Sequence, residues 1–169
     1  MENIYDLVII GGGPAGITAG IYAKRAGLKV CILEANFLGG EVNNTFEVDN
    51  YPGFHNINGM ELMQKMGEHL QSLNVEIVYE NATKIQNENE EIKTIITASG
   101  NTISTKTIIL AIGAKPRKLN APGEQEFAGR GVSYCAVCDG SFFKNKDVAV
   151  IGGGNTAMEN AIYLRNVEN

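Results

Sequence analysis

The sequence has 169 residues, enough for one hydrophobic core of ordinary size, so length alone predicts one domain or slightly more. With 44% hydrophobic and 20% charged residues, the composition is that of a globular protein and excludes a disordered chain. The net charge of -5 and the lack of a Lys/Arg cluster argue against nucleic acid as the main partner.

The N-terminus carries acids where a secretory signal would carry bases, and the apolar run Leu7–Ile10 is too short for the core of such a signal. No stretch approaches the roughly 20 apolar residues that a membrane-spanning helix needs. We therefore expect a cytoplasmic protein with no membrane partner. In a reducing cytoplasm a closely spaced cysteine pair is more often catalytic than structural.

A buried apolar strand is predicted over residues 4–10, followed by a glycine-rich turn and a helix that extends to about residue 26. The turn reads Gly11-Gly12-Gly13-Pro14-Ala15-Gly16. A second strand covers residues 29–33 and ends on Glu34. This is G-x-G-x-x-G between a strand and a helix, with an acid about 20 residues further on, which predicts a dinucleotide-binding loop. The alternative is a glycine-rich turn that binds no ligand.

Each residue of this pattern has a physical task. Gly11 allows the tight turn, Gly13 lets the backbone approach a pyrophosphate, and Gly16 lets helix and strand pack closely. Glu34 can accept hydrogen bonds from ribose hydroxyls. Cys31, inside the second strand, is interpreted as a small core hydrophobe.

Residues 35–58 form a long connection rich in Asn, Gly and aromatic residues, which favours a ligand-wrapping loop over a plain packed loop. The next segment, 59–73, is predicted as an amphipathic helix. Its apolar stripe consists of Leu62, Met63, Met66, Leu70 and Leu73. His69 borders this stripe and is interpreted as a packing or surface histidine.

Shorter strands follow the helix, the first over residues 75–79. Strands over 82–86, 92–97 and 102–105 predict a small antiparallel meander laid on the main sheet, with the acidic stretch 88–91 as a solvated turn. A further buried strand covers residues 107–112 and ends at Gly113.

The last third of the chain begins with a candidate domain boundary at residues 114–122, which contain two of the four prolines. A short strand is possible over 131–134, before the cysteine pair. A strong apolar strand over 147–151 runs into Gly152-Gly153-Gly154-Asn155-Thr156-Ala157 and a helix to about residue 166. This G-x-G-x-x-A turn predicts a second dinucleotide loop.

Between the two loops, Cys135 and Cys138 have the C-x-x-C spacing, which suits either a redox dithiol or half of a zinc site. The sequence has no second C-x-x-C pair, and His55 and His69 lack ligand spacing, so no metal set is expected. A thiol near a helix N-terminus has a stabilised thiolate, and the adjacent Asp139 can shuttle its proton. The alternative for Asp139 is a helix cap or turn residue.

Six motifs in this order resemble the low-molecular-weight thioredoxin reductases of bacteria, flavoproteins of the pyridine nucleotide disulfide oxidoreductase superfamily. They are Gly11-Gly12-Gly13-Pro14-Ala15-Gly16, Gly39-Gly40, Asn50-Tyr51-Pro52-Gly53, Ala111-Ile112-Gly113-Ala114, Cys135-Ala136-Val137-Cys138-Asp139-Gly140 and Gly152-Gly153-Gly154-Asn155-Thr156-Ala157. The resemblance spans the whole chain, which matches the front half of such enzymes.

The resemblance implies an α/β fold with two parts. Residues 1–114 would be a Rossmann-like FAD-binding domain, with a parallel sheet and a small antiparallel meander, that lacks its usual C-terminal return segment. Residues 115–169 would begin a truncated NADPH-binding Rossmann-like domain that carries the C-x-x-C. The implied FAD residues are Gly11, Gly13, Pro14, Ala15, Gly16, Glu34, Gly39, Gly40, Glu41, Asn50, Ala111 and Gly113. The implied NADPH residues are Gly152, Gly154, Asn155, Thr156 and Ala157.

By the same resemblance, electrons pass from NADPH through FAD and the dithiol to the disulfide of thioredoxin. Cys138 would face the flavin, Cys135 would attack thioredoxin, Asp139 would be the proton donor, and the enzyme would be a homodimer. Two alternatives remain: an FAD-dependent dithiol oxidase that passes electrons to oxygen, and a non-catalytic FAD-binding module.

The sequence departs from the family in two places. Glu41 stands where the family usually has glutamine, and a carboxylate facing the flavin would lower the flavin potential. The basic residues that select NADPH would lie beyond Asn169, so we expect a fragment that neither binds NADPH properly nor turns over. Because strand 147–151 would then lack a neighbour, instability or association is expected.

Overall fold

A computed structural model of the chain describes residues 3–45, 47–114 and 117–167. The chain divides into two compact units. The first unit comprises residues 1–47 and 56–114, and the second comprises residues 48–55 and 115–169.

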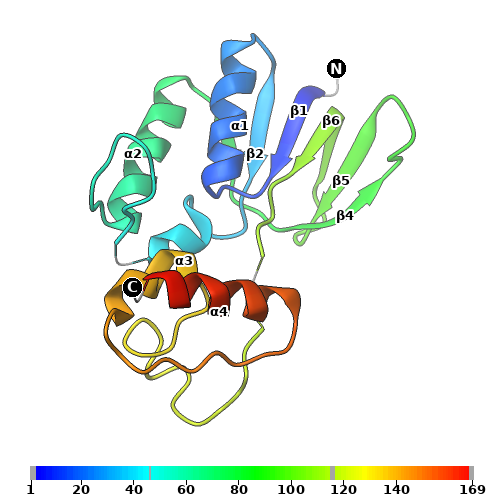
Figure 1. Cartoon of the computed structure of the whole chain (residues 1–169). Coiled ribbons are helices and arrows are strands. Elements are labelled where there is room, and N and C mark those ends of the chain that lie inside the picture. Colours follow the sequence, from blue (N-terminus) through cyan, green and yellow to red (C-terminus); the bar gives the residue numbers. More distant parts are fainter. Residues whose placement is uncertain (1–2, 46, 115–116, 168–169) are drawn as a thin grey trace. The chain divides into compact units, whose positions relative to one another are not determined.

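The first unit is built on a six-stranded mixed sheet whose spatial order is β3-β2-β1-β6-β5-β4 (Figure 1). The strands are β1 (Tyr5–Ile10), β2 (Val30–Leu33), β3 (Glu76–Val78), β4 (Ala82–Gln86), β5 (Lys93–Thr97) and β6 (Thr102–Leu110). β1 pairs in parallel with β2 and β6, and β2 pairs in parallel with β3. β5 pairs antiparallel with both β4 and β6, so these three strands form the expected meander.

Two details of the sequence prediction are wrong. Strands predicted over 102–105 and 107–112 are one continuous strand, β6, and the meander extends the main sheet instead of lying on it. The reason is that a strand has two hydrogen-bonding edges. β6 gives one edge to β1 through residues 105–110 and the other to β5 through residues 102–105.

Helices α1 (Pro14–Arg25) and α2 (Gly59–Ser72) cover the sheet, as the sequence predicts. The expected stripe of α2 is confirmed: Leu62, Met63 and Leu70 are buried, and Met66 and Leu73 pack against the core. The side chain of Asn58 caps α2 by accepting a hydrogen bond from the Met60 amide at 2.9 Å. In the described residues, no helix is both long and apolar enough to cross a bilayer.

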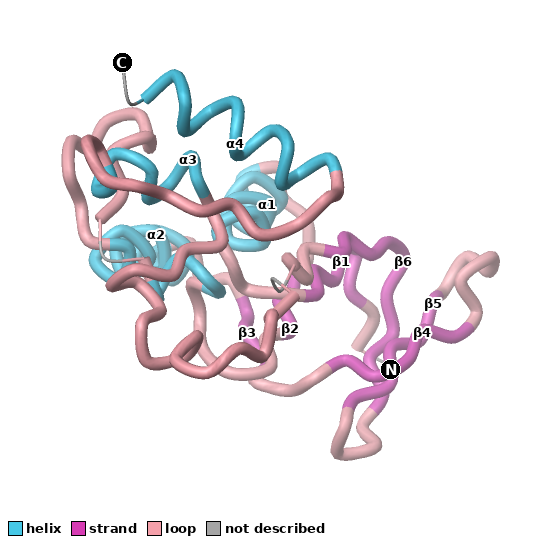
Figure 2. The backbone as a smooth tube through the Cα atoms, turned by 60° about the horizontal axis from the view of Figure 1, so that its bottom comes forward, coloured by secondary structure: helices cyan, strands magenta, loops and turns pink. Residues whose placement is uncertain are grey.

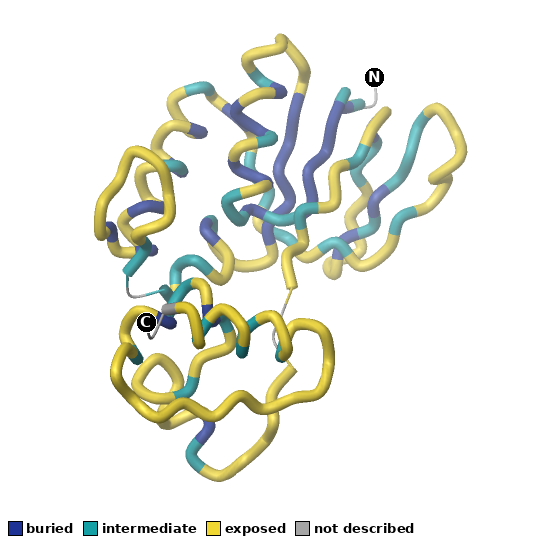
Figure 3. The backbone as a smooth tube through the Cα atoms, in the orientation of Figure 1, coloured by how far each residue is buried: buried dark blue, intermediate teal, exposed yellow. Residues whose placement is uncertain are grey.

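The central strands are buried on both faces (Figure 3). Alternate residues of β1 enter two different clusters. Leu7 and Ile9 pack with α1 and α2 residues, whereas Val8 packs in a second cluster with Cys31 and Ile95. The prediction that Cys31 is a core residue is therefore confirmed, since none of its surface is exposed.

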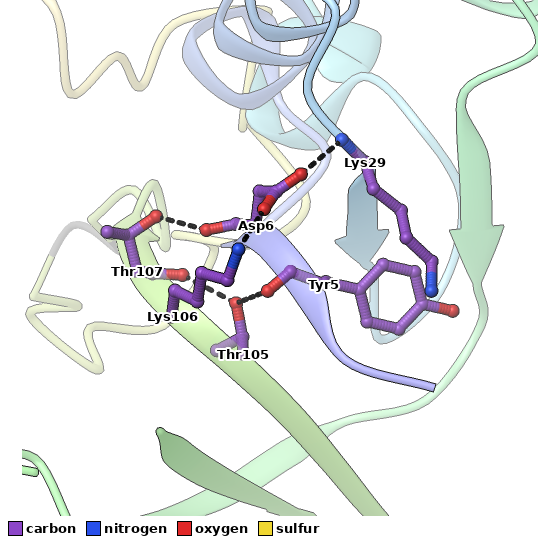
Figure 4. A network of polar contacts seen from close by, with 6 residues as sticks. All are labelled: Tyr5, Asp6, Lys29, Thr105, Lys106 and Thr107. Carbon is purple, nitrogen blue, oxygen red and sulfur yellow. Dashed lines mark hydrogen bonds and ion pairs between the residues drawn. The ribbon is translucent and has the colours of Figure 1, made fainter. Parts of the chain in front are cut away.

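A polar network ties β1 to its neighbours at the end of the sheet where β1 begins (Figure 4). The carboxylate of Asp6 accepts a hydrogen bond from the Lys29 amide at 2.9 Å and forms an ion pair with the Lys106 ammonium at 2.7 Å. The Lys106 ammonium, followed by the Lys29 amide, lowers the pKa of Asp6. Thr107 donates to the Asp6 carbonyl at 2.5 Å. These contacts fix the register of β1 against β6, and with it the point at which the first glycine turn leaves the sheet.

In the second unit, helices and loops predominate (Figure 2). Its elements are α3 (Ala136–Asp139), a 3-10 helix η2 (Gly140–Phe143) and α4 (Asn155–Val167). The strand predicted over residues 147–151 is not formed, and the one predicted over 131–134 is reduced to an isolated bridge between Ala128 and Val132. A strand requires a partner strand for its backbone, and the described residues of this unit supply none. Ile151 is consequently 68% exposed.

Candidate functional site

The first glycine turn lies where the ends of β1, β2 and β6 converge. The Gly11 amide donates to the Leu33 carbonyl at 2.8 Å, and the Ala111 amide donates to the Ile10 carbonyl at the same distance. Gly11 has φ +106°, and a Cβ on it would lie 2.3 Å from the Ala111 carbonyl oxygen. Both observations require glycine at this position.

Gly16 and Gly13 differ in what surrounds them. A Cβ on Gly16 would lie 1.9 Å from the Gly11 carbonyl oxygen, so Gly16 lets α1 pack on the turn. A Cβ on Gly13 would meet no atom within 4 Å among the described residues. Gly13 is the N-cap of α1 and Pro14 occupies the first turn, so the amides at this helix end have no side-chain cap from Gly13. Open space beside free amides suits an anionic ligand.

The carboxylate of Glu34 is bound to the same turn. Its Oε2 accepts a hydrogen bond from the Gly12 amide at 2.6 Å, and its Oε1 accepts one from the Asn36 amide at 2.9 Å. The side chain is buried, with 9% of the residue exposed. Each carboxylate oxygen has more than one acceptor position, so hydrogen bonds from ribose hydroxyls remain compatible with this arrangement.

The segment Gly39–Gly40 lies against the first turn. The Gly39 amide donates to the Gly12 carbonyl at 2.8 Å, and a Cβ on Gly40 would lie 3.3 Å from the Gly13 Cα. Both glycines have positive φ, +117° and +57°. The long connection thus has an element of its own, the 3-10 helix η1 (Gly40–Asn44), which the sequence analysis did not predict.

The remaining residues assigned to the flavin lie in different surroundings. Glu41 is exposed in η1, where its carboxylate accepts a hydrogen bond from the Asn44 amide group at 3.4 Å. Ala111 follows β6 beside Gly11, and the exposed Gly113 has φ +66°. Asn50 is exposed and belongs to the second unit. The first unit therefore brings backbone from two further segments, 39–40 and 111, against the first glycine turn, 11–16.

Cys135 and Cys138 form a disulfide, with 5.3 Å between their Cα atoms. Cys135 is the N-cap of the single turn α3, and its sulfur accepts a hydrogen bond from the Cys138 amide at 3.2 Å. The Asp139 amide donates to the Cys135 carbonyl at 3.0 Å. The C-x-x-C spacing therefore brings the sulfurs together by wrapping one helical turn.

The side chain of Asp139 is hydrogen-bonded to Ser133, which lies two residues before Cys135. The Ser133 hydroxyl lies 2.5 Å from Asp139 Oδ2. Asp139 precedes η2, but its side chain makes no capping hydrogen bond there. The carboxylate thus contacts Ser133, just before the turn that carries the disulfide, instead of capping the following helix.

Sequence reasoning missed Glu124, which is only 7% exposed. Its Oε1 accepts hydrogen bonds from the Tyr134 hydroxyl at 2.5 Å and the Leu119 amide at 2.8 Å. Its Oε2 accepts one from the Asn120 amide at 2.5 Å. A single acidic residue after Pro-Gly belongs to no periodic pattern or motif spacing, so the sequence does not indicate that its carboxylate is buried and hydrogen-bonded. Because Tyr134 precedes Cys135, this carboxylate anchors the N-terminal side of the turn that carries the disulfide.

The Tyr134 hydroxyl, followed by the Leu119 amide, lowers the pKa of Glu124 from its ordinary value of 4.5. A carboxyl group whose pKa is lower in the folded state stabilises that state above its unfolded pKa and loses this contribution as the pH falls through its folded pKa. We therefore expect Glu124→Gln to lower the melting temperature at neutral pH, and the difference from the parent chain to shrink below about pH 4.5. Thermal unfolding followed by circular dichroism at several pH values measures this. A difference that stays constant with pH would contradict it.

The second glycine turn, Gly152–Ala157, leads into α4 without a preceding strand. Gly152 has φ +136°, and the Ala157 amide donates to the Gly154 carbonyl at 3.0 Å. The turn is exposed from Gly152 to Thr156. Across the described ranges, no group of three or more His, Cys, Asp or Glu residues is placed to hold a metal ion.

The family model of the pyridine nucleotide-disulphide oxidoreductases matches residues 5–169. The chain is 50% identical to thioredoxin reductase of Ureaplasma parvum over 166 residues, which cover 98% of this chain and 53% of that protein. It is 48% identical over 164 residues to the bifunctional thioredoxin reductase/thioredoxin of Mycobacterium leprae, covering 96% of this chain and 36% of that protein. The crystal structure of thioredoxin reductase from Streptococcus pyogenes has a TM-score of 0.90 and 49% identity, with 98% of this chain and 54% of that chain covered.

The chain spans about half the length of the thioredoxin reductases from Ureaplasma parvum and Streptococcus pyogenes. The resemblance seen in the six sequence motifs is confirmed by the family match, which includes both glycine turns and the disulfide. The protein belongs to the pyridine nucleotide-disulphide oxidoreductase family.

Proposed function

We propose that this chain is part of a flavoprotein disulfide reductase. The enzyme passes electrons from NADPH through FAD and the Cys135–Cys138 couple to the disulfide of thioredoxin. The observation that carries the proposal is the disulfide on the single turn α3, in a chain that also has open space beside Gly13 at the N-terminus of α1. Thioredoxin as the substrate is supported by the similar proteins from Ureaplasma parvum and Mycobacterium leprae, which are named as thioredoxin reductases.

The first unit fits FAD by its backbone. Gly40 lies close to the Gly13 Cα, and the N-terminus of α1 has no capping side chain, so its first amides would be available to the pyrophosphate. In the proposal, residues 1–114 form the FAD-binding domain, with Glu34 toward the ribose. FAD would supply a two-electron carrier between NADPH and the dithiol. The implied NADPH residues, Gly152 to Ala157, would begin the second domain at residues 115–169.

The cysteine pair would perform the exchange with thioredoxin. The Cys135 thiolate attacks the substrate disulfide, whose S–S bond breaks as a mixed disulfide forms. Cys138 then attacks the Cys135 sulfur, which releases the reduced substrate and restores the Cys135–Cys138 bond. Two electrons and two protons pass from the dithiol to the substrate. Asp139, next to Cys138, would relay a proton in this exchange. The proposal includes a homodimer and a cytoplasmic location, where thiols are kept reduced.

The decisive experiment is FAD binding by the chain and by Gly13→Ala. A methyl group on Gly13 would meet no atom of the described residues within 4 Å, so the melting temperature should stay unchanged. The same methyl group would occupy the space proposed for the pyrophosphate, so the affinity for FAD should fall at least about tenfold, or about 1.4 kcal/mol. Flavin fluorescence titration measures the affinity.

Gly153→Ala is the matched control, because its Cβ also meets no described atom within 4 Å and it belongs to the second turn. It should bind FAD like the parent chain. Unchanged FAD affinity in Gly13→Ala would contradict the assigned loop, and a parent chain that binds no FAD would contradict the flavoprotein proposal. Bound flavin that is bleached by a dithiol but not by NADPH would point to the incomplete fragment or to the FAD-dependent dithiol oxidase.

A further inference from the structure

Ser133 contacts both ends of the redox turn, which is the turn from Cys135 to Asp139 that carries the disulfide. The Cys135 amide donates a hydrogen bond to Ser133 Oγ at 3.1 Å. Ser133 Oγ lies 2.5 Å from Asp139 Oδ2 and 3.3 Å from the Cys135 carbonyl oxygen. A hydroxyl has one proton to donate, and the shorter contact to an ionised carboxylate is the stronger one. Ser133 therefore accepts from the Cys135 backbone and donates to Asp139.

The Ser133–Asp139 hydrogen bond closes a loop that contains both cysteines. The two partners are six positions apart: Ser133 lies before Cys135, and Asp139 directly follows Cys138. Among the residues that the structure describes, Ser133 is the only donor to the Asp139 carboxylate. Asp139 is half-buried and Ser133 is exposed, so the serine acts on the carboxylate through this hydrogen bond and not through buried packing of its own.

We propose that Ser133 is a positioning residue for proton transfer at the dithiol, a role that rests on the proposed function. When Cys138 loses its proton to attack the mixed disulfide, the proton passes to the Asp139 carboxylate and then to the departing substrate thiolate. The mixed disulfide breaks, the Cys135–Cys138 bond forms, and the substrate is reduced by the two electrons that the dithiol loses. Ser133 holds the carboxylate beside the turn throughout and touches no reacting sulfur itself.

The test uses two disulfides with different leaving groups. Oxidised glutathione releases a basic alkyl thiolate, which needs a proton, whereas an aromatic disulfide releases a weakly basic thiolate, which does not. Ser133→Ala in the whole chain should slow oxidation of the reduced protein by glutathione disulfide about tenfold, a fraction of what general acid–base catalysis supplies. Its rate with the aromatic disulfide should fall clearly less, since the weakly basic thiolate needs no proton and only the deprotonation of Cys138 still uses the carboxylate.

Three controls separate positioning from a structural effect. Ser133→Thr keeps the hydroxyl and should restore the parent rate, and the exposed site leaves no buried cavity in the alanine variant. Asp139→Asn should show the same selective slowing, and adding Ser133→Ala to it should cause no further loss. Equal slowing with both disulfides, additive losses in the double variant, or an Asp139→Asn variant that does not distinguish the disulfides would each overturn the proposal.

Failure of the proposed function and failure of the Ser133 proposal give different results. A reduced parent chain that does not reduce oxidised thioredoxin would contradict the thioredoxin reductase proposal. The two small disulfides would still report on Ser133, because their reactions require neither flavin nor thioredoxin.

Discussion

Replacing Cys138 by serine is expected to trap the chain in a covalent complex with thioredoxin. In the proposed exchange, Cys135 forms the mixed disulfide and Cys138 releases it. Without the second thiol, the mixed disulfide has no internal attacker, so release of reduced thioredoxin should stop. Non-reducing electrophoresis and mass spectrometry of the intact complex measure the trapped species. Cys135→Ser should yield no such complex.

Cys31→Ala provides the matched control, because Cys31 is the third cysteine of the chain. Burial raises the pKa of the Cys31 thiol to about 12, so it has almost no thiolate at neutral pH. Combined with Cys138→Ser, its removal should leave the trapped fraction unchanged. A complex that forms with Cys135→Ser instead would reverse the roles of the two cysteines, and a complex that depends on Cys31 would contradict the assigned couple.

Gly16→Ala is expected to have the largest effect on stability. Its Cβ would lie 1.9 Å from the Gly11 carbonyl oxygen and 3.0 Å from the Gly11 carbonyl carbon, both backbone atoms that no side-chain rotation can move. Accommodating it requires α1 to shift away from the sheet and disturbs the packing of Ile17, which is fully buried. We expect a loss of about 3 kcal/mol in the free energy of unfolding, at the upper end for overpacking. Thermal and urea unfolding measure it, with a decrease of more than about 10 °C in melting temperature.

Gly67→Ala is the control for this substitution. Gly67 is also a buried helical glycine, in α2, but among the described residues its Cβ would meet only Leu38 Cδ1, at an ordinary 3.6 Å. Alanine is the better helix former by about 0.5–1 kcal/mol, so this variant should be as stable as the parent chain or slightly more stable. A Gly16→Ala variant that melts with the parent chain would contradict the close approach of α1 to the turn.

Much of the first unit could be predicted because its signals are local. The apolar run of β1, the glycine turn and α1 follow one another within the chain, so hydrophobic period and turn residues suffice to identify them. The stripe of α2 is visible for the same reason. The cysteine couple was also predictable, since a spacing of three brings two side chains onto one helical turn.

The candidate site was predictable only in part. The sequence indicates the glycine turn and Glu34 as ligand contacts, yet only the structure shows that Glu34 accepts a hydrogen bond from the Gly12 amide. It also shows that Gly39 hydrogen-bonds to Gly12. These contacts join residues more than 20 positions apart, and nothing in the spacing of a carboxylate reveals which amide it meets.

The amino-acid sequence by itself determined the chain's family, its two glycine turns and the closely spaced cysteine pair, because short motifs in a fixed order depend only on neighbouring residues. The tertiary structure alone decided that residues 102–110 form one strand and that 147–151 form none. Strands exist through hydrogen bonds to partners elsewhere in the chain, which apolar composition does not encode. Hydrogen bonds from side chains such as Ser133 to Asp139 and Tyr134 to Glu124 likewise arise only when folding brings a donor to an acceptor.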